Sequence, residues 1–248
     1  YLGTRLGLEG KANLIISEAS PGSELKLEPL LKLSDAGLIL NQDNAGNLVI
    51  ENSSYFIPEA IVRKIERNSA DAQITKSMSW FVNSFESEAA KASYGFVLGT
   101  DSEGLSGNEI ILNEELASKI NAKAGGKITL RYYPADYRSD PKELSASFTV
   151  KRIITADAAE KFRSLVPDIP GLTGKSDCSE WDAGIDIDFS RITEYDKDYW
   201  RKYGMAPKAL ISLDTASKIW RNRFGQVSAV RITNAGSVFL GSLTPESA

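Results

Sequence analysis

The sequence predicts an α+β fold in which mixed or antiparallel sheets are combined with short helices. Apolar residues alternate from Ala72 to Val82, which is typical of a half-buried strand. The segment 41–47 reads NQDNAGN and separates two apolar triplets, so it favours a β-hairpin. Asn113 precedes two glutamates and an apolar stripe, which is the pattern of a capped helix.

The first hundred residues supply the other elements of one half of this fold. The apolar run at 14–16 suits a buried strand. Pro58 suits the first turn of a helix that continues to about Arg67. Residues 94–98 are expected to pair antiparallel with the alternating strand, and residues 99–107 are expected to form a loop.

The middle of the chain reads as a strand, a helix and two further strands. Residues 109–112 form an apolar strand before the helix capped by Asn113, and Gly125 and Gly126 are expected to end that helix. Alternation then predicts a strand at 128–132 and another around 148–150.

Composition and charge exclude several classes of function. The 248 residues carry a net charge of −4, whereas a nucleic-acid-binding protein usually needs a concentrated basic surface. Without histidine the chain cannot perform Ser-His-Asp or Cys-His catalysis by itself, and its single cysteine excludes an internal disulfide. No apolar run reaches the length of a membrane span, and the chain begins at Tyr1. We therefore expect an excised soluble piece of a longer protein.

An acidic loop at 177–188 leaves three interpretations open. If Asp186 and Asp188 lie on one strand, their side chains point to the same face at about 7 Å. That separation is within the range of hydrolytic carboxylate pairs. A cation site is the second interpretation, and a solvated loop whose carboxylates cap turns is the third. The solvated loop is favoured because the spacing lacks the regularity and the glycine of a calcium loop.

Two motifs in the same region are expected to have no catalytic role. Residues 174–176 read GKS, like the end of a phosphate-binding loop, but Ile169 and Pro170 stand where that motif needs glycine and backbone N–H groups. A surface turn is expected instead. Cys178 is expected in a polar loop, and no histidine is present to activate its thiol.

Aromatic residues near the C-terminus provide the candidate interaction surface. A short helix at 196–203 has one apolar face, and core packing is favoured over docking for that face. An amphipathic helix at 214–224 is expected to bury Ala216, Ile219, Trp220 and Phe224. The residues that could instead contact a partner or a lipid-like cargo are Asp198, Tyr199, Trp200, Tyr203 and Trp220.

Several sequence pieces occur in an order that resembles the large extracytoplasmic loop of FtsX-like ABC transporter permeases, the class that includes the MacB-type transporters. The pattern LNEELASKINAKAGGKITLRYY at 112–133 resembles this family too. The other matching pieces are Pro170–Gly171, Cys178 with Trp181–Asp182, Asp198–Tyr199–Trp200, Pro207–Lys208–Ala209, and Trp220 with Arg223–Phe224–Gly225.

The resemblance implies that residues 1–248 are one extracytoplasmic domain in two lobes, about 1–106 and 107–248. It leaves open whether the N-terminal part of this domain is complete. Such a domain is non-catalytic and needs no cofactor, and ATP is hydrolysed by a separate cytoplasmic ABC ATPase subunit. It relays the ATP-driven conformational change to an extracytoplasmic partner or to a lipid, lipoprotein or peptide cargo. The full transporter would lie in the cell membrane, could be a dimer, and would not bind nucleic acid.

Two other functions remain as alternatives. The first is a secreted glycan hydrolase that uses the acidic loop at 177–188. The second is a free-standing extracellular binding module.

Overall fold

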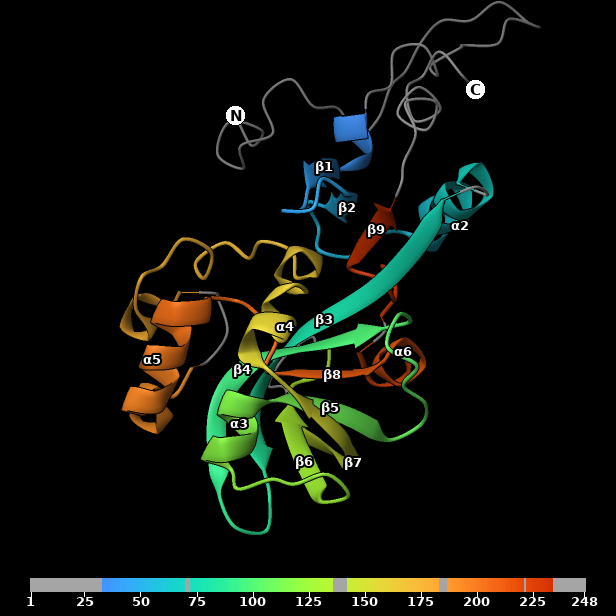
Figure 1. The fold of residues 1–248 in the computed structure, drawn as a ribbon. Coiled ribbons are helices and arrows are strands. Elements are labelled where there is room, and N and C mark those ends of the chain that lie inside the picture. The colour runs from blue at the N-terminus through green and yellow to red at the C-terminus, as the bar shows by residue number, and fades with distance from the viewer. Residues whose placement is uncertain (1–32, 70–71, 136–141, 183–186, 221, 234–248) are drawn as a thin grey trace, which may run out of the picture.

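A computed structural model describes residues 33–69, 72–135, 142–182, 187–220 and 222–233. The expected strand at 14–16 and Asp186 of the acidic loop lie outside these residues. Helices and strands are mixed, so the predicted α+β class is confirmed. The strands of the described residues form one sheet in the order β1-β2-β9-β3-β4-β8-β5-β7-β6 (Figure 1).

Six of these strands close into a barrel, because β6 pairs with both β7 and β3. The closing pairs join Ser84–Glu86 to Thr129–Arg131. The pairs β4–β8 and β5–β7 are parallel, and the other pairs around the ring are antiparallel. The barrel strands are β3 (Gln73–Glu86), β4 (Lys91–Thr100), β5 (Glu109–Asn113), β6 (Lys127–Tyr132), β7 (Leu144–Ile154) and β8 (Ala209–Ser212).

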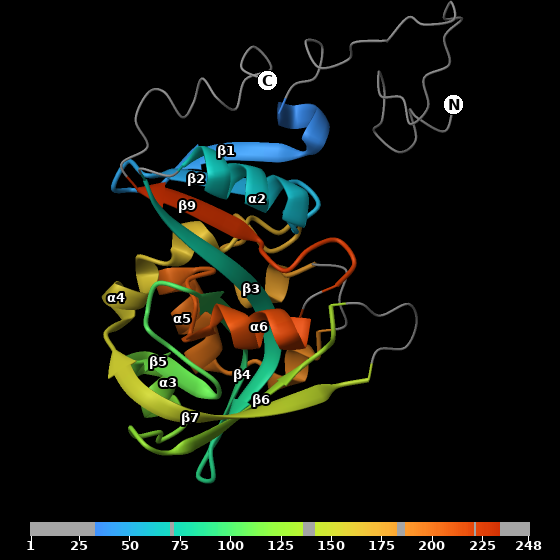
Figure 2. The same ribbon diagram turned by 90° about the vertical axis from the view of Figure 1, so that its right-hand side faces the viewer.

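The remaining three strands extend the sheet beyond the barrel along the first half of β3. β9 (Ala229–Thr233) pairs with residues 73–77 of β3, β2 (Leu48–Asn52) pairs with β9, and β1 (Leu38–Gln42) pairs with β2. Figure 2 shows this extension above the barrel, with the long strand β3 running through both. Strands from both sides of residue 106 therefore pair within one sheet.

Short helices cover the sheet, and side-chain caps mark the starts of α3 (Glu114–Lys119) and α5 (Glu194–Tyr203). The Asn113 side chain accepts a hydrogen bond from the Leu116 N–H, and Thr193 and Asp196 form a reciprocal capping box. No helix among the described residues is long and apolar enough to cross a membrane. The α-helices are α2 (Glu59–Asn68), α3 (Glu114–Lys119), α4 (Ala156–Glu160), α5 (Glu194–Tyr203) and α6 (Leu213–Trp220).

Apolar side chains gather in separate cores on the two faces of the sheet. The barrel interior is filled by all six barrel strands, with Leu116 of α3 and Trp220 of α6 packed against them. The outer face of β4 and β8 is covered by Leu165, Trp181 and Trp200, which belong to the segment between β7 and β8. A third core joins α2 to the strand extension.

Three expectations about element ends and burial were wrong. The helix expected at 214–224 ends at Trp220, and the Phe224 side chain is 56% exposed on a turn. The helix capped by Asn113 ends at Lys119, because Asn121 already adopts a left-handed backbone with φ 50° before the two glycines. Cys178 lies in a short 3-10 turn and is completely buried, because Asp177 caps that turn and places the thiol against the outer core.

Candidate functional site

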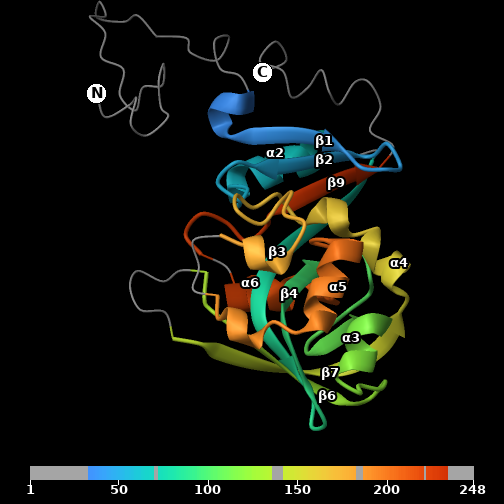
Figure 3. The same cartoon turned by 90° about the vertical axis from the view of Figure 1, so that its left-hand side faces the viewer.

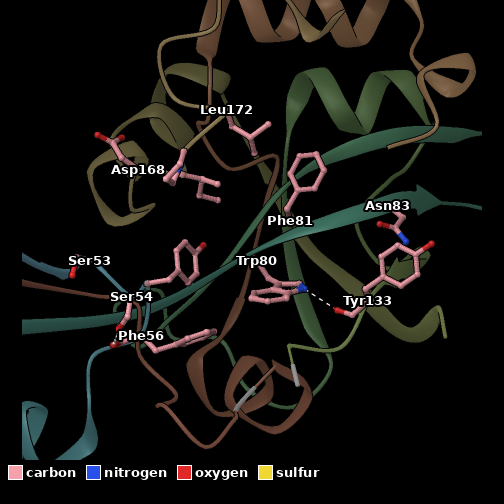
Figure 4. Close-up of a pocket in the computed structure, with 12 residues that line it drawn as sticks. Ser53, Ser54, Phe56, Trp80, Phe81, Asn83, Tyr133, Asp168 and Leu172 are labelled. Atoms are coloured by element: carbon pink, nitrogen blue, oxygen red, sulfur yellow. Dashed lines mark hydrogen bonds between the residues drawn. The ribbon is translucent and has the colours of Figure 1, made fainter. Parts of the chain in front are cut away.

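One described hollow combines a volume of about 400 Å³ with a lining rich in aromatic side chains, and we call it the aromatic cleft. This volume falls within the range of small-molecule sites in proteins. Figure 4 shows the lining side chains around the middle of β3. The lining consists of Ser53, Ser54, Tyr55, Phe56, Trp80, Phe81, Asn83, Tyr133, Asp168, Ile169, Pro170 and Leu172.

The aromatic cleft exists because β3 is longer than the strands that pair with one of its edges. β9 covers residues 73–77 and β6 covers residues 84–86, so residues 78–83 have no strand on that side. Trp80 and Phe81 are consecutive strand residues and point to opposite faces of the sheet. Both line the cleft, which therefore wraps around this open edge.

The polar groups of the Tyr55 and Trp80 side chains are bonded to the protein. The Tyr55 hydroxyl donates to the Ser79 carbonyl at 3.0 Å and lies 2.7 Å from the Ser79 hydroxyl. The Trp80 indole N–H donates to the Tyr133 carbonyl at 2.9 Å (Figure 4). Burial raises the pKa of Tyr55, so the hydroxyl stays protonated. Tyr55 and Trp80 therefore offer their ring faces, rather than their polar tips, to a ligand.

Backbone strain is also present at the wall of the cleft. Tyr55 has φ 74°, a left-handed conformation that a bulky residue adopts only when its surroundings hold it there. Its ring packs edge-on against Phe56 at 5.3 Å and Trp80 at 6.3 Å between centroids. These contacts and the hydroxyl bonds fix the Tyr55 ring as a rigid part of the cleft wall.

Asp168 is the charged side chain of the lining, and 68% of it is exposed. Its Oδ1 accepts hydrogen bonds from Arg163 at 3.0 Å and from the Thr173 hydroxyl at 3.3 Å. Glu51 lies buried nearby on β2 and accepts a hydrogen bond from Asn41 at 3.3 Å. Burial, and then the charge of Asp168, raise the pKa of Glu51 to about 7.

None of the five residues chosen from the sequence lines the aromatic cleft. Tyr199, Trp200, Tyr203 and Trp220 are buried, whereas Asp198 is exposed and pairs with Arg201 at 2.7 Å. Figures 2 and 3 show α6 and α5 on opposite sides of the molecule. Trp220 belongs to the barrel interior and Trp200 to the outer core, so these residues do not form one surface.

Hydrogen bonds explain why the aromatics of α5 are inside. The Tyr199 hydroxyl accepts from the Asn113 side-chain amide at 2.7 Å and donates to the Ala206 carbonyl at 3.2 Å. The Trp200 indole N–H donates to the Lys175 carbonyl at 2.9 Å. Polar tips that are satisfied in this way let large rings be buried at low cost. The packing interpretation of this helix is the one that the structure supports.

A buried ion pair next to α5 was missed by the sequence reasoning. The Lys208 amine lies 3.2 Å from Asp196 Oδ1, and both side chains are almost completely buried. The amine also lies over the Tyr195 and Tyr199 rings, 5.0 and 4.9 Å from their centroids. Burial lowers the pKa of Lys208. A lysine directly before the apolar strand β8 was the available signal.

Two described carboxylates of the acidic loop, Asp177 and Asp188, act as caps. Asp177 accepts hydrogen bonds from the N–H and hydroxyl of Ser179, and these bonds lower its pKa. Asp188 is bonded in the same way to Ser190, with the same effect on its pKa. The described part of the chain contains no group of three acidic, cysteine or histidine side chains placed to hold a metal ion.

The other motifs of this region are structural in the described residues. Residues 174–176 form an exposed turn, as expected, with Gly174 at φ 79°. Burial raises the pKa of the Cys178 thiol to about 12. A thiol with this pKa is protonated at neutral pH and is a poor nucleophile.

A comparison with models of known protein families found no match, and a comparison with curated proteins found no significant match. The function of the aromatic cleft therefore rests on its geometry and chemistry.

Proposed function

We propose that this chain is a non-catalytic extracytoplasmic domain of an FtsX-like ABC transporter permease of the MacB type, and that it binds its cargo or partner in the aromatic cleft. The observation that carries the binding role is a cleft of about 400 Å³ with an aromatic wall, in which the polar tips of Tyr55 and Trp80 are bonded internally. This wall favours an apolar group of the ligand, because a polar group placed against the rings would lose water without gaining a partner there. The resemblance in the sequence supports the permease context.

The walls of the cleft suggest how motion would reach the ligand. Ser53 to Phe56 follow the strand extension, whereas Tyr133 follows barrel strand β6. A shift of the extension relative to the barrel would therefore widen or narrow the cleft. We retain two lobes as part of this proposal, but strands pair across residue 106, so the parts that move would be the extension and the barrel.

The complete transporter in this proposal lies in the cell membrane with this domain on the extracytoplasmic side. A cytoplasmic ABC ATPase subunit supplies the energy, and the two ends are coupled because each biases the same pair of arrangements. A lipid, lipoprotein or peptide is the cargo, and a dimer is an assembly compatible with the proposal.

The test uses the full-length protein and an ATPase subunit that co-purifies with it. Replacing Trp80→Leu removes one ring face of the cleft and is expected to abolish cargo-dependent stimulation of ATP hydrolysis while basal hydrolysis stays unchanged. Phe224→Leu is the matched control, because Phe224 is exposed and does not line the cleft. Equal thermal stability of the two variants shows that both are folded.

Two results would contradict the proposal. The permease context fails if the full-length protein contains no membrane span or retains no ABC ATPase subunit. The binding role of the cleft fails if Trp80→Leu leaves the stimulated activity unchanged.

A further inference from the structure

We propose that the aromatic cleft takes a short extended peptide, which pairs with the open edge of β3 at Phe81 and places a basic residue next to Asp168. This inference rests on the proposed function, because it names the class of cargo or partner for the same cleft.

The backbone groups of Phe81 point into the cleft. Phe81 lies opposite Phe96 of β4, and the Phe96 carbonyl accepts a hydrogen bond from the Lys208 N–H on its other side. Phe81 and Phe96 therefore form a non-hydrogen-bonded pair. In such a pair the N–H and C=O of each residue point away from the partner strand, so those of Phe81 point away from β4 towards the open edge.

Ser77, Ser79 and Asn83 lie on the same side of the strand as Phe81 in the alternation, and backbone groups of each are bonded on this edge. The Ser77 carbonyl accepts from the Ser228 N–H at 2.8 Å, and the Ser79 N–H donates to the Ser228 hydroxyl at 3.0 Å. The Asn83 carbonyl accepts from Arg191 at 3.0 Å. Within the described part of the chain, the Phe81 N–H and C=O have no partner on this edge.

An added strand fits this edge. Residues 78–83 have no strand partner on this edge and measure about 20 Å along an extended chain, and a peptide there would pair with the N–H and C=O of Phe81. It is bounded by β9 and β6, which both pair with β3, so a peptide between them would continue a pairing that the sheet already uses. Peptides that add a strand to a sheet gain affinity from main-chain hydrogen bonds and specificity from side-chain pockets. The volume of about 400 Å³ limits the peptide to a few residues.

The side chains of the cleft match the alternation of a strand. Successive side chains of an added strand would point to opposite faces of the sheet. One face offers the rings of Tyr55, Phe56 and Trp80, and the other offers Phe81 and Leu172. Two consecutive apolar residues of a peptide would therefore each find an apolar wall.

Charge complementarity selects the flanking residue. Asp168 is the charged residue of the described lining, and it is largely exposed. Arg163 and Thr173 bond its Oδ1, whereas its Oδ2 has no hydrogen-bond partner among the described residues. A lysine or arginine two positions beyond the apolar pair of the peptide would meet this oxygen.

The experiment uses the chain labelled with ¹⁵N-phenylalanine and a capped probe peptide, acetyl-Thr-Val-Leu-Thr-Lys-amide. Binding is expected to shift the Phe81 amide resonance and to slow its hydrogen exchange, because the amide gains an acceptor. N-methylation of the central Val and Leu removes main-chain donors and is expected to weaken binding about tenfold. Replacing Asp168→Asn is expected to weaken binding of the lysine peptide about two- to fivefold.

The controls separate strand pairing from simple apolar binding. Asp157→Asn removes an exposed acid on α4 outside the cleft and is expected to leave the affinity unchanged. Replacing the peptide lysine with glutamate is expected to weaken binding to the unaltered chain but not to the Asp168→Asn variant.

Several outcomes would overturn the inference. They are no peptide binding, equal binding of the N-methylated peptide, or an unchanged Phe81 amide. Dodecanoate is the comparison probe. If dodecanoate binds in the cleft and the peptide does not, the peptide inference fails while the proposed function stands. The proposed function itself is tested separately, by the ATPase activity that accompanies the full-length protein.

Discussion

Glu51 is the residue whose charge is least compatible with its position. It is 8% exposed on β2 and faces Arg163 and Asp168 of the segment that covers the strand extension. Asn41 donates its one hydrogen bond, and Arg231 on the neighbouring strand β9 is engaged with Asp43 at 3.1 Å. Burial disfavours the charged form, and Asp168 adds repulsion that Arg163 only partly offsets.

We predict that Glu51→Gln stabilises the protein above pH 7 and has little effect near pH 4.5. The folded-state pKa of about 7 lies above the ordinary value of 4.5, so the folded protein favours the protonated carboxyl. The contribution of the Glu51 carboxyl to the free energy of unfolding is therefore fully present below pH 4.5 and is lost as pH rises through 7. The gain at pH 8 is at most about 3 kcal/mol.

Urea unfolding at pH 5 and pH 8 measures this difference. Glu59→Gln is the control, because Glu59 is exposed and pairs only with Arg63 on the same helix. An equal effect of Glu51→Gln at both pH values would show that the Glu51 carboxyl titrates normally in the folded protein.

At the scale of elements, the close contact between α6 and β4 decides where the helix lies. A Cβ at Gly99 of β4 would overlap the Cβ of Ala216 on α6, and the glycine has no left-handed backbone to explain it. Glycine is therefore needed at this position for the approach of the helix. The approach seats Trp220 in the barrel interior, where its ring lies 5.7 Å from Tyr132.

We predict that Gly99→Ala destabilises the protein by about 1–3 kcal/mol, because the core is overpacked at this contact. Ala216→Gly alone should cost about 1 kcal/mol through helix propensity. The double variant should be more stable than the sum of the two changes implies, since the second change makes room for the first. Chemical denaturation of the four proteins measures this coupling, and additive effects would contradict the contact.

Elements that depend on interactions between near neighbours in the sequence were predicted correctly, and those that depend on distant contacts were not. The hairpin of β1 and β2, the helix begun by Pro58 and the cap at Asn113 were predicted, because turn and cap chemistry acts within a few residues. The end of α6 was predicted too late, because Phe224 has an apolar side chain but no neighbour to bury it. Strand β8 was not predicted, because four buried residues show no alternation.

At the scale of the whole molecule, β3 makes the barrel and the extension one structure. Of its 14 residues, those from 77 to 86 pair with β4, while residues 73–77 pair with β9 and residues 84–86 pair with β6. Loss of the barrel would remove the partner of β9, and loss of β9 would expose the third core. The two parts are therefore expected to unfold together.

We predict one cooperative unfolding transition, in which far-ultraviolet circular dichroism and tryptophan fluorescence coincide. Hydrogen exchange provides a second measurement, since the amides of Val230 in β9 and Leu98 in β4 should open with similar free energies. Separate transitions for the extension and the barrel would contradict this prediction.

The sequence by itself determined the α+β class, most of the strand and helix positions in the described residues, and the local caps, because these depend on periodicity and on contacts between near neighbours. It could not determine that β6 pairs with β3 to close the barrel, or that β9 pairs with β3 only as far as residue 77. Such pairings depend on contacts between residues far apart in the chain. Tertiary structure alone therefore decided the open edge of β3 and the aromatic cleft beside it. It also placed Tyr199 and Trp200 of α5 and Trp220 of α6 inside, because only the fold brings near the side chains that pack against their rings and the partners that bond the polar tips of Tyr199 and Trp200.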